Sequence, residues 1–204
     1  MIILASPAEI LETTSSYVLD LLAKQLDPKI LFHNQRHTVQ CVHAVQEITD
    51  AMQLSPSEKT SVQIAAWFLN VGYIQKDGDP MECALEQFEE FSDLYELDAA
   101  NSDLVKSCLS NVKYPKDNQS PAEGVLHDAY WYFLSASNHI EMCDRLRREW
   151  SHQDKLYDDL SWRDFVCDLY KQPRYFTSYG RTVLEKRKQV NYYMCLTRLY
   201  GVAL

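Results

Sequence analysis

Apolar residues recur at steps of three and four positions along nearly the whole chain, and this spacing constrains the fold more than any other feature. Between residues 36 and 52 one side of the expected helix carries Val39, Val42, Val45, Ile48 and Met52. An α-helix has 3.6 residues per turn, so this spacing predicts an amphipathic helix. No segment of useful length alternates apolar and polar residues as a strand does. The sequence therefore predicts an all-α fold.

Several of the expected helices begin with a polar capping residue followed by proline. Ser6 and Pro7 open the first helix, and Ser55 and Pro56 open the third. A serine at this position accepts a hydrogen bond from a free backbone N–H, and proline is tolerated in the first turn. Further helical periods cover about residues 81–94, 101–112, 122–134, 138–150, 161–171 and 178–200. No linker or repeat divides the chain, which predicts one compact bundle over residues 1–204.

Composition supports a folded domain and argues against several classes of function. Apolar residues make up 46% of the 204 residues, enough to build a core, and five glycines are few for a β-sandwich. The 29 acidic residues exceed the 20 basic ones, and the net charge of −9 argues against general binding to nucleic acids. The chain has no run of about eighteen apolar residues, so we expect no membrane span.

The N-terminus and the cysteines predict a cytoplasmic protein. The first ten residues, MIILASPAEI, lack a basic leader and soon become polar, so we expect no signal peptide. The six cysteines are dispersed, at positions 41, 83, 108, 143, 167 and 195, and none belongs to a CxxC pair. In a reducing compartment such cysteines behave as small hydrophobes, and they predict neither a zinc ribbon nor a disulfide framework.

The histidines mark the place where chemistry is to be expected. His33, Asn34, Arg36 and His37 fall within five positions at the start of the second predicted helix. Imidazoles bind divalent metals, and a helix N-terminus beside an arginine suits a phosphate group. Two histidines four residues apart are more often ordinary polar residues than metal ligands. The segment by itself therefore does not define a site.

Three segments, taken in order, resemble the motifs of the HD-domain superfamily in its compact bacterial phosphohydrolase-like branch. Residues 33–38, HNQRHT, are similar to a first motif of His-Asn, two residues and His-Thr. Residues 65–73, AAWFLNVGY, are similar to Ala-Ala-Trp-Phe-His-Asp-x-Gly-Tyr, and residues 125–129, VLHDA, to a segment containing Asp-Ala-Asp. The resemblance covers about residues 15–195. It is especially close to small HD proteins that act as effector domains in bacterial cyclic-nucleotide anti-phage signalling, and it implies an all-α fold and a metal-dependent phosphohydrolase site.

The metal ligands implied by this resemblance are only partly present. His37 stands at the first ligand position and Asp128 at the last, but Leu69 and Asn70 replace the His-Asp doublet. Leucine offers no lone pair and the amide of Asn70 is neutral, so one negative charge remains. Glu82 is the catalytic candidate, in the place of a water-positioning acid. Losing an outer partner of a metal site already costs about 10–100-fold, so we expect weak or absent metal binding and little turnover.

A rearranged metal site is one alternative. In it His33 or Glu82 supplies a substitute ligand, and the site binds manganese, iron, zinc or magnesium. His127 adjoins Asp128, but neighbours on a helix point about 100° apart, so His127 is the poorer candidate.

A second alternative gives these residues only structural roles. Leu69 then packs in the core, and Asn70 and His37 form hydrogen bonds with each other or with Asp128. Tyr130, in the place of the second aspartate of the third motif, fits the same loss of metal chemistry.

Three hypotheses for function follow. In the first, the chain is a divergent HD-domain pseudoenzyme that binds a phosphorylated small molecule such as a nucleotide, or a protein partner. The ligand-binding candidates are His33, Asn34, Arg36 and Lys113. The second is a phosphohydrolase with the rearranged metal site, and the third is a helical scaffold. The first is favoured, because cationic side chains hold a phosphate without cleaving it.

Overall fold

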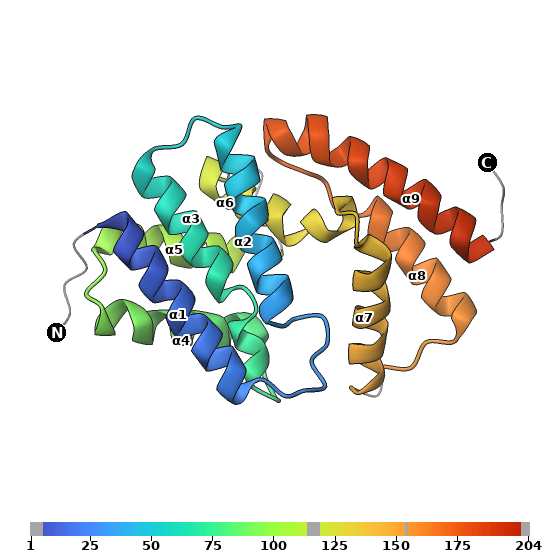
Figure 1. The fold of residues 1–204 in the computed structure, drawn as a ribbon, viewed down its shortest axis with the longest axis horizontal. Coiled ribbons are helices and arrows are strands. Elements are labelled where there is room, and N and C mark those ends of the chain that lie inside the picture. Colours follow the sequence, from blue (N-terminus) through green and yellow to red (C-terminus); the bar gives the residue numbers. More distant parts are fainter. Residues whose placement is uncertain (1–5, 114–118, 154, 201–204) are drawn as a thin grey trace.

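The computed structural model describes residues 6–113, 119–153 and 155–200, which form an all-α fold (Figure 1). The α-helices of these residues are α1 (Pro7–Gln25), α2 (Gln35–Asp50), α3 (Pro56–Phe68), α4 (Pro80–Leu94), α5 (Ala99–Asn111), α6 (Pro121–Tyr130), α7 (His139–Ser151), α8 (Asp159–Lys171) and α9 (Glu185–Tyr200). Short helical turns are η1 (Val71–Ile74), η2 (Tyr132–Ser135) and η3 (Gly180–Leu184), and η3 is a π-helix. The predicted helical bundle is confirmed. None of the described helices has the length and apolar character needed to cross a bilayer.

The predicted helix starts are confirmed by the capping geometry. Ser6 caps α1 and Ser55 caps α3, each accepting a hydrogen bond from a backbone N–H of the first turn. Glu58 completes a capping box with Ser55. Asp79 caps α4, and its side chain accepts a hydrogen bond from the backbone N–H of Met81. Each of these three helices has proline at its beginning, where no intrahelical hydrogen bond is lost.

Two predicted helices are interrupted in the structure. The helix expected over residues 122–134 ends at Tyr130 and continues as the 3₁₀ turn η2. This tighter turn brings Phe133 and Leu134 into a separate hydrophobic cluster, which a straight helix does not do. The helix expected over residues 178–200 begins with the π-helix η3 before α9 follows.

The first hydrophobic cluster is built mainly by α1 to α6. Helix α3 lies at its centre and contacts α1, α2, α4, α5 and α6. Its buried side chains include Val62, Ile64 and Phe68. Phe68 packs against Phe88 and Phe91 of α4, with ring centroids 5.4 and 5.5 Å apart.

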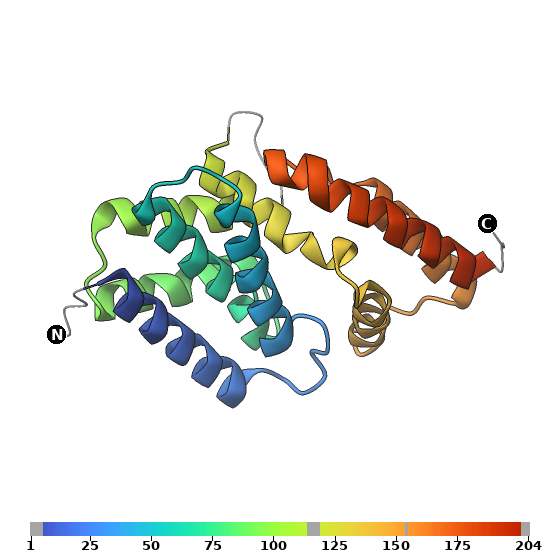
Figure 2. The same ribbon diagram turned by 45° about the horizontal axis from the view of Figure 1, so that its top comes forward.

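The second hydrophobic cluster is built by η2 and helices α7, α8 and α9 (Figure 2). Its members include Leu146, Trp162 and Val166. Phe32, from the loop before α2, also belongs to it and lies 5.1 Å from Phe133 between ring centroids. The loop before α2 therefore lies where the two clusters meet, and this position determines the surroundings of the histidines.

Candidate functional site

A cavity of about 1100 Å³ lies where the two clusters meet. One part of its wall comes from the loop before α2, from η1, from Lys113 and from α6. The other part comes from α7, α8 and the segment that precedes η3. Because the lining residues are spread from position 27 to position 176, the cavity exists only in the folded chain.

Five cations line this cavity, but only two of the described acids do. The cations are Lys29, Lys76, Lys113, Lys155 and Arg174, and the acids are Asp27 and Glu149. Within residues 6–113, 119–153 and 155–200, none of the five cations forms an ion pair. Arg36, Arg145 and Arg187 elsewhere each pair with a glutamate at 2.7–2.9 Å. A chain of net charge −9 therefore gathers unpaired positive charge at one place.

Aromatic side chains form much of the remaining wall. They are Phe32, Tyr73, Tyr130, Trp131, Phe133, Trp150, Phe165 and Phe176. Tyr73 stacks on His33, with ring centroids 3.8 Å apart and planes 9° from parallel. The Nζ atom of Lys155 lies 5.4 Å from the centre of a Trp150 ring. The wall thus offers cations to an anionic group and aromatic faces to a planar one.

His33 is held in this wall by a buried carboxylate. Its Nδ1 lies 2.5 Å from Oε1 of Glu149, while Oε2 of Glu149 accepts from the backbone N–H groups of Phe32 and His33 at 2.7 and 3.0 Å. Burial lowers the pKa of His33, although the hydrogen bond to Glu149 and the charge of Glu149 raise it, and the nearby Lys113 adds to the lowering. Burial alone raises the pKa of Glu149, but the hydrogen bonds from His33 and the backbone lower it overall. A neutral His33 therefore donates through Nδ1 to an ionised Glu149, which leaves Nε2 as an acceptor.

His127 lines the same cavity and was not among the residues predicted to bind ligand. Its Nδ1 lies 2.7 Å from the carbonyl oxygen of Val112. A carbonyl only accepts, so Nδ1 carries the proton. Burial lowers the pKa of His127, and its buried Nε2 makes no hydrogen bond to any described residue. The ring is consequently neutral, with an unused acceptor.

His37 lies outside the cavity, although only four residues separate it from His33. The ring is fully buried between Phe32 and Phe133, with centroids 4.4 and 6.2 Å away, and its Nε2 lies 3.6 Å from Sγ of Cys41. Burial lowers the pKa of His37 to about 3, and its Nδ1 has no hydrogen-bond partner among the described residues. His37 is therefore a neutral side chain of the core.

Leu69 and Asn70 are both buried beside this region. Leu69 belongs to the first hydrophobic cluster, as the structural alternative predicted. A side-chain contact with Asn70 raises the pKa of His37 against the effect of burial, and Nδ2 of Asn70 donates to Oγ1 of Thr38 at 3.0 Å. The Oδ1 atom of Asn70 makes no hydrogen bond to a described residue. Asn70 thus combines the expected contact with His37 and a hydrogen bond to Thr38.

Asp128 holds a different part of the fold. Its Oδ1 accepts from the backbone N–H of Phe176 at 2.8 Å, and Oδ2 accepts from the N–H and the hydroxyl of Thr177 at 2.9 and 2.6 Å. Gly180 passes so close that a Cβ there would lie 2.1 Å from Oδ2. Both oxygens therefore fix the segment that leads into η3, while the neighbouring His127 lines the cavity.

The described residues do not fit the divalent metal that the HD resemblance implies. No three His, Cys, Asp or Glu side chains come close enough together to hold an ion, in the part of the chain that the structure describes. The three candidates provide two neutral groups, His37 and Asn70, and a carboxylate that is already hydrogen-bonded three times, Asp128. The function proposed below uses no metal.

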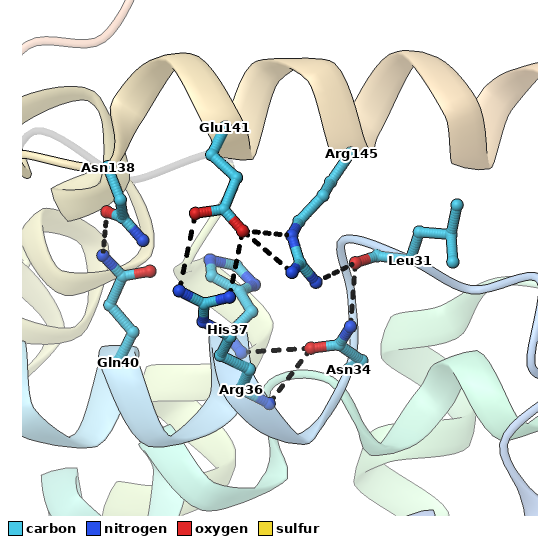
Figure 3. Close-up of polar contacts among 8 residues, drawn as sticks. All are labelled: Leu31, Asn34, Arg36, His37, Gln40, Asn138, Glu141 and Arg145. Atoms are coloured by element: carbon cyan, nitrogen blue, oxygen red, sulfur yellow. Dashed lines mark hydrogen bonds and ion pairs between the residues drawn. The ribbon is translucent and has the colours of Figure 1, made fainter.

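Two of the four ligand-binding candidates have structural contacts instead (Figure 3). The side chain of Asn34 caps α2, accepting from the N–H groups of Arg36 and His37, and donates to the carbonyl of Leu31. Arg36 points to α7 and pairs with Glu141 at 2.9 Å. His33 and Lys113, the other two candidates, both line the cavity. Glu82, the catalytic candidate, is exposed in the first turn of α4 and is absent from the cavity wall.

Comparison with known proteins gives no further guide, because no protein-family model, curated protein or solved structure matches this chain. Sequence reasoning missed most of the cavity cations, including Lys29, Lys76 and Arg174. They belong to separate loops and share no motif, so no local pattern could have indicated them. The one available signal was His127, a histidine that directly precedes Asp128 within a motif.

Proposed function

We propose that this chain is a divergent HD-domain protein that binds a phosphorylated small molecule, such as a nucleotide, in the central cavity without hydrolysing it. The observation that carries this proposal is the group of five cations on the cavity wall, none of which pairs with an acid among the described residues. The same wall contains the aromatic side chains that a planar ring would contact.

The charge distribution supports a small anionic ligand. Lysine and arginine form strong charge-assisted hydrogen bonds with phosphate oxygens, and the guanidinium of Arg174 can bind two oxygens at once. Lys113 is half-buried, so its attraction for an anion is less screened than that of an exposed lysine. Because the chain as a whole is acidic, extended polyanions are repelled while a compact phosphate can enter the cationic cavity.

The size and the polarity of the cavity support a nucleotide-like molecule. Ligand pockets commonly enclose about 300–1000 Å³, and this cavity, at about 1100 Å³, is slightly larger than that range. Stacking on an aromatic side chain contributes about 1–3 kcal/mol per base. A ligand with a planar ring and a phosphate group would use both kinds of surface.

The arrangement of the catalytic candidates supports binding over hydrolysis. Glu82 is exposed on α4, and His37 packs behind Phe32, which itself lines the cavity. Asp128 is fully hydrogen-bonded to the segment before η3. A phosphate placed among Lys113 and Arg174 would thus meet cations, but not the predicted acid or metal ligands.

Isothermal titration calorimetry with pyrophosphate and with adenosine 5′-monophosphate tests this proposal. The variants are Lys113→Gln and Arg174→Gln, and the matched control is Lys59→Gln, which removes the same charge from α3, away from the cavity. A hydrogen bond to a charged group contributes about 1.5–3 kcal/mol, so each cavity variant should weaken binding by about 10- to 100-fold.

Two results would contradict the proposal. One is that the unaltered protein binds neither pyrophosphate nor the nucleotide at low salt. The other is that Lys59→Gln weakens binding as much as the cavity variants do. Release of inorganic phosphate during the titration would instead favour the phosphohydrolase hypothesis.

A further inference from the structure

A second hollow, separate from the central cavity, lies between α2 and α9. It is a groove of about 980 Å³ that shares no lining residue with the cavity. Helix α2 forms one wall and α9 forms the other, and residues 132–138, which include η2, complete the groove. The function proposed above does not use this groove.

Four basic side chains line the groove, and none of the described acidic residues does. The four are Arg36, His43, Lys186 and Arg187. Arg36 and Arg187 each pair with a glutamate, but a guanidinium has five N–H donors and keeps some of them for another carboxylate. Lys186 forms no ion pair within residues 6–113, 119–153 and 155–200. The groove therefore offers positive charge to an acidic surface.

An exposed apolar strip continues along α9 from this groove. Val190 lines the groove and is 58% exposed. Tyr193 and Met194 follow it at three and four positions, on the same face of the helix, and are 52% and 53% exposed. Adjoining apolar side chains on a surface mark places where proteins interact. The surface that covers the groove should therefore carry apolar as well as acidic side chains.

The same chain has such a surface on α4 and on the loop that follows it. Residues 80–98 contain seven acidic residues and no lysine or arginine, and all seven acids are exposed. Among the described residues only one of these acids forms an ion pair, Glu89 with Lys106 at 3.8 Å. Leu94 lies one helical turn after Glu90 and is 56% exposed. The α4 surface thus complements the groove in charge and adds an apolar side chain.

The two surfaces can meet only between separate copies of the chain. Helices α4 and α9 lie at opposite ends of the molecule in both views (Figures 1 and 2). A symmetric pairing of two α9 helices is disfavoured, because residues 185–200 contain four lysines and arginines and one glutamate. Like charges placed against each other cost several kcal/mol in an interface. Charge therefore favours α4 over α9 as the surface that a second copy presents.

We infer that the groove between α2 and α9 binds the acidic surface of α4 from a second copy of the chain. Because the two surfaces differ, the contact is head to tail, and each complex keeps one free groove and one free α4 surface to which further copies add. Charged pairs at the rim of an interface determine orientation more than affinity, so the association should be weak and sensitive to salt.

Sedimentation velocity of the unaltered protein tests this inference. At an ionic strength of about 0.15 M the Debye length is about 8 Å, which screens the repulsion between two acidic molecules but preserves attraction between charges in contact. The average mass should rise with protein concentration. At about 1 M the Debye length is about 3 Å, and the association should weaken.

Reversing one charge on either surface identifies the contact. Lys186→Glu alters the groove and Glu90→Lys alters α4, and each should weaken the association at least about tenfold, because repulsion replaces attraction. Lys59→Glu on α3 and Glu12→Lys on α1 make the same changes in charge outside both surfaces, so they are the controls and should associate normally. A mixture of Lys186→Glu and Glu90→Lys should form a complex with one copy of each and nothing larger, since each keeps one intact surface.

Several outcomes would overturn the inference. A monomer at every concentration leaves the groove to an acidic segment of another protein. Association that survives both Lys186→Glu and Glu90→Lys indicates another interface, such as α9 against α9. Equal losses in the two controls, or a mixture that forms no complex, also contradict the contact. All four variants alter side chains at the surface, and their circular dichroism should match that of the unaltered protein. The binding of pyrophosphate in the central cavity is tested separately, so either proposal can fail without the other.

Discussion

His33 and His37 are four residues apart in sequence, and their ring centroids lie 6.1 Å apart. One ring nevertheless lines the cavity while the other packs in the core. His33 has a carboxylate partner, Glu149, and lines the cavity. His37 has no hydrogen-bond partner for its Nδ1 in the part of the chain that the structure describes, and it is enclosed by Phe32 and Phe133. The residue that contacts each imidazole therefore decides whether that histidine lines the cavity or packs in the core. A buried imidazole becomes part of a site when a neighbour fixes its proton and leaves the other nitrogen facing a ligand.

The largest expected effect comes from removing the partner of His33. Glu149→Leu leaves three donors without their acceptor: two backbone N–H groups and Nδ1 of His33. A buried donor left without its acceptor costs about 1–3 kcal/mol, so with three such donors the free energy of unfolding should fall by about 3 kcal/mol or more. Urea denaturation monitored by circular dichroism measures it. Glu141→Leu, which removes a partly exposed carboxylate from the same helix, should cost much less, and equal losses would contradict the contrast.

The dependence of stability on pH tests the other histidine. Burial lowers the pKa of His37 to about 3, from an ordinary value near 6.5. Below about pH 6.5 the unfolded chain takes up a proton at this position, whereas the folded chain does not until about pH 3. The free energy of unfolding should therefore fall with decreasing pH across this window, by at most about 1.4 kcal/mol per pH unit from this residue.

Denaturation series in the presence of a chelator measure this slope. His37→Leu should reduce it, because the substituted side chain cannot titrate in either state. His43→Leu, on the exposed face of the same helix, should leave it unchanged. An unaltered slope in His37→Leu would show that His37 is not the neutral core residue described above.

The smallest expected effect comes from a substitution that gives His37 a carboxylate neighbour, as His33 has. Asn70→Asp places a carboxylate where the neutral amide already influences the pKa of His37. A carboxylate favours the charged imidazolium, so the pKa of His37 should rise by about one unit, equivalent to about 1.4 kcal/mol. Nuclear magnetic resonance titration of the imidazole protons measures it. If the pKa of His37 stays near 3, the two side chains are not coupled as the structure indicates.

Several local features could be predicted from the sequence because their causes are local. The capping residues Ser6, Ser55 and Asp79 start the helices that were expected after them. Leu69 packs in the core, as one alternative proposed. The C-terminal end of α6 was not predicted correctly, because the change to a 3₁₀ turn depends on the second cluster, which α7 and α8 complete.

The candidate site was predicted less well, because motif position does not fix which way a side chain faces. His33 and Lys113 line the cavity, but Asn34 and Arg36 contact the protein itself. Asp128 and His127 are adjacent in sequence, and the helix turns them about 100° apart, so one holds a loop and the other faces the cavity.

The sequence by itself determined the helices, their starts and the apolar faces that bury them, since a few residues within one or two turns decide each of these. Only the tertiary structure decided where the cations of the cavity wall gather and which histidine donates its proton to a carboxylate. The physical reason is distance along the chain. Glu149 lies more than one hundred positions from His33, and Arg174 lies on a segment remote from Lys29, so only the packing of the two clusters brings these charges to one cavity.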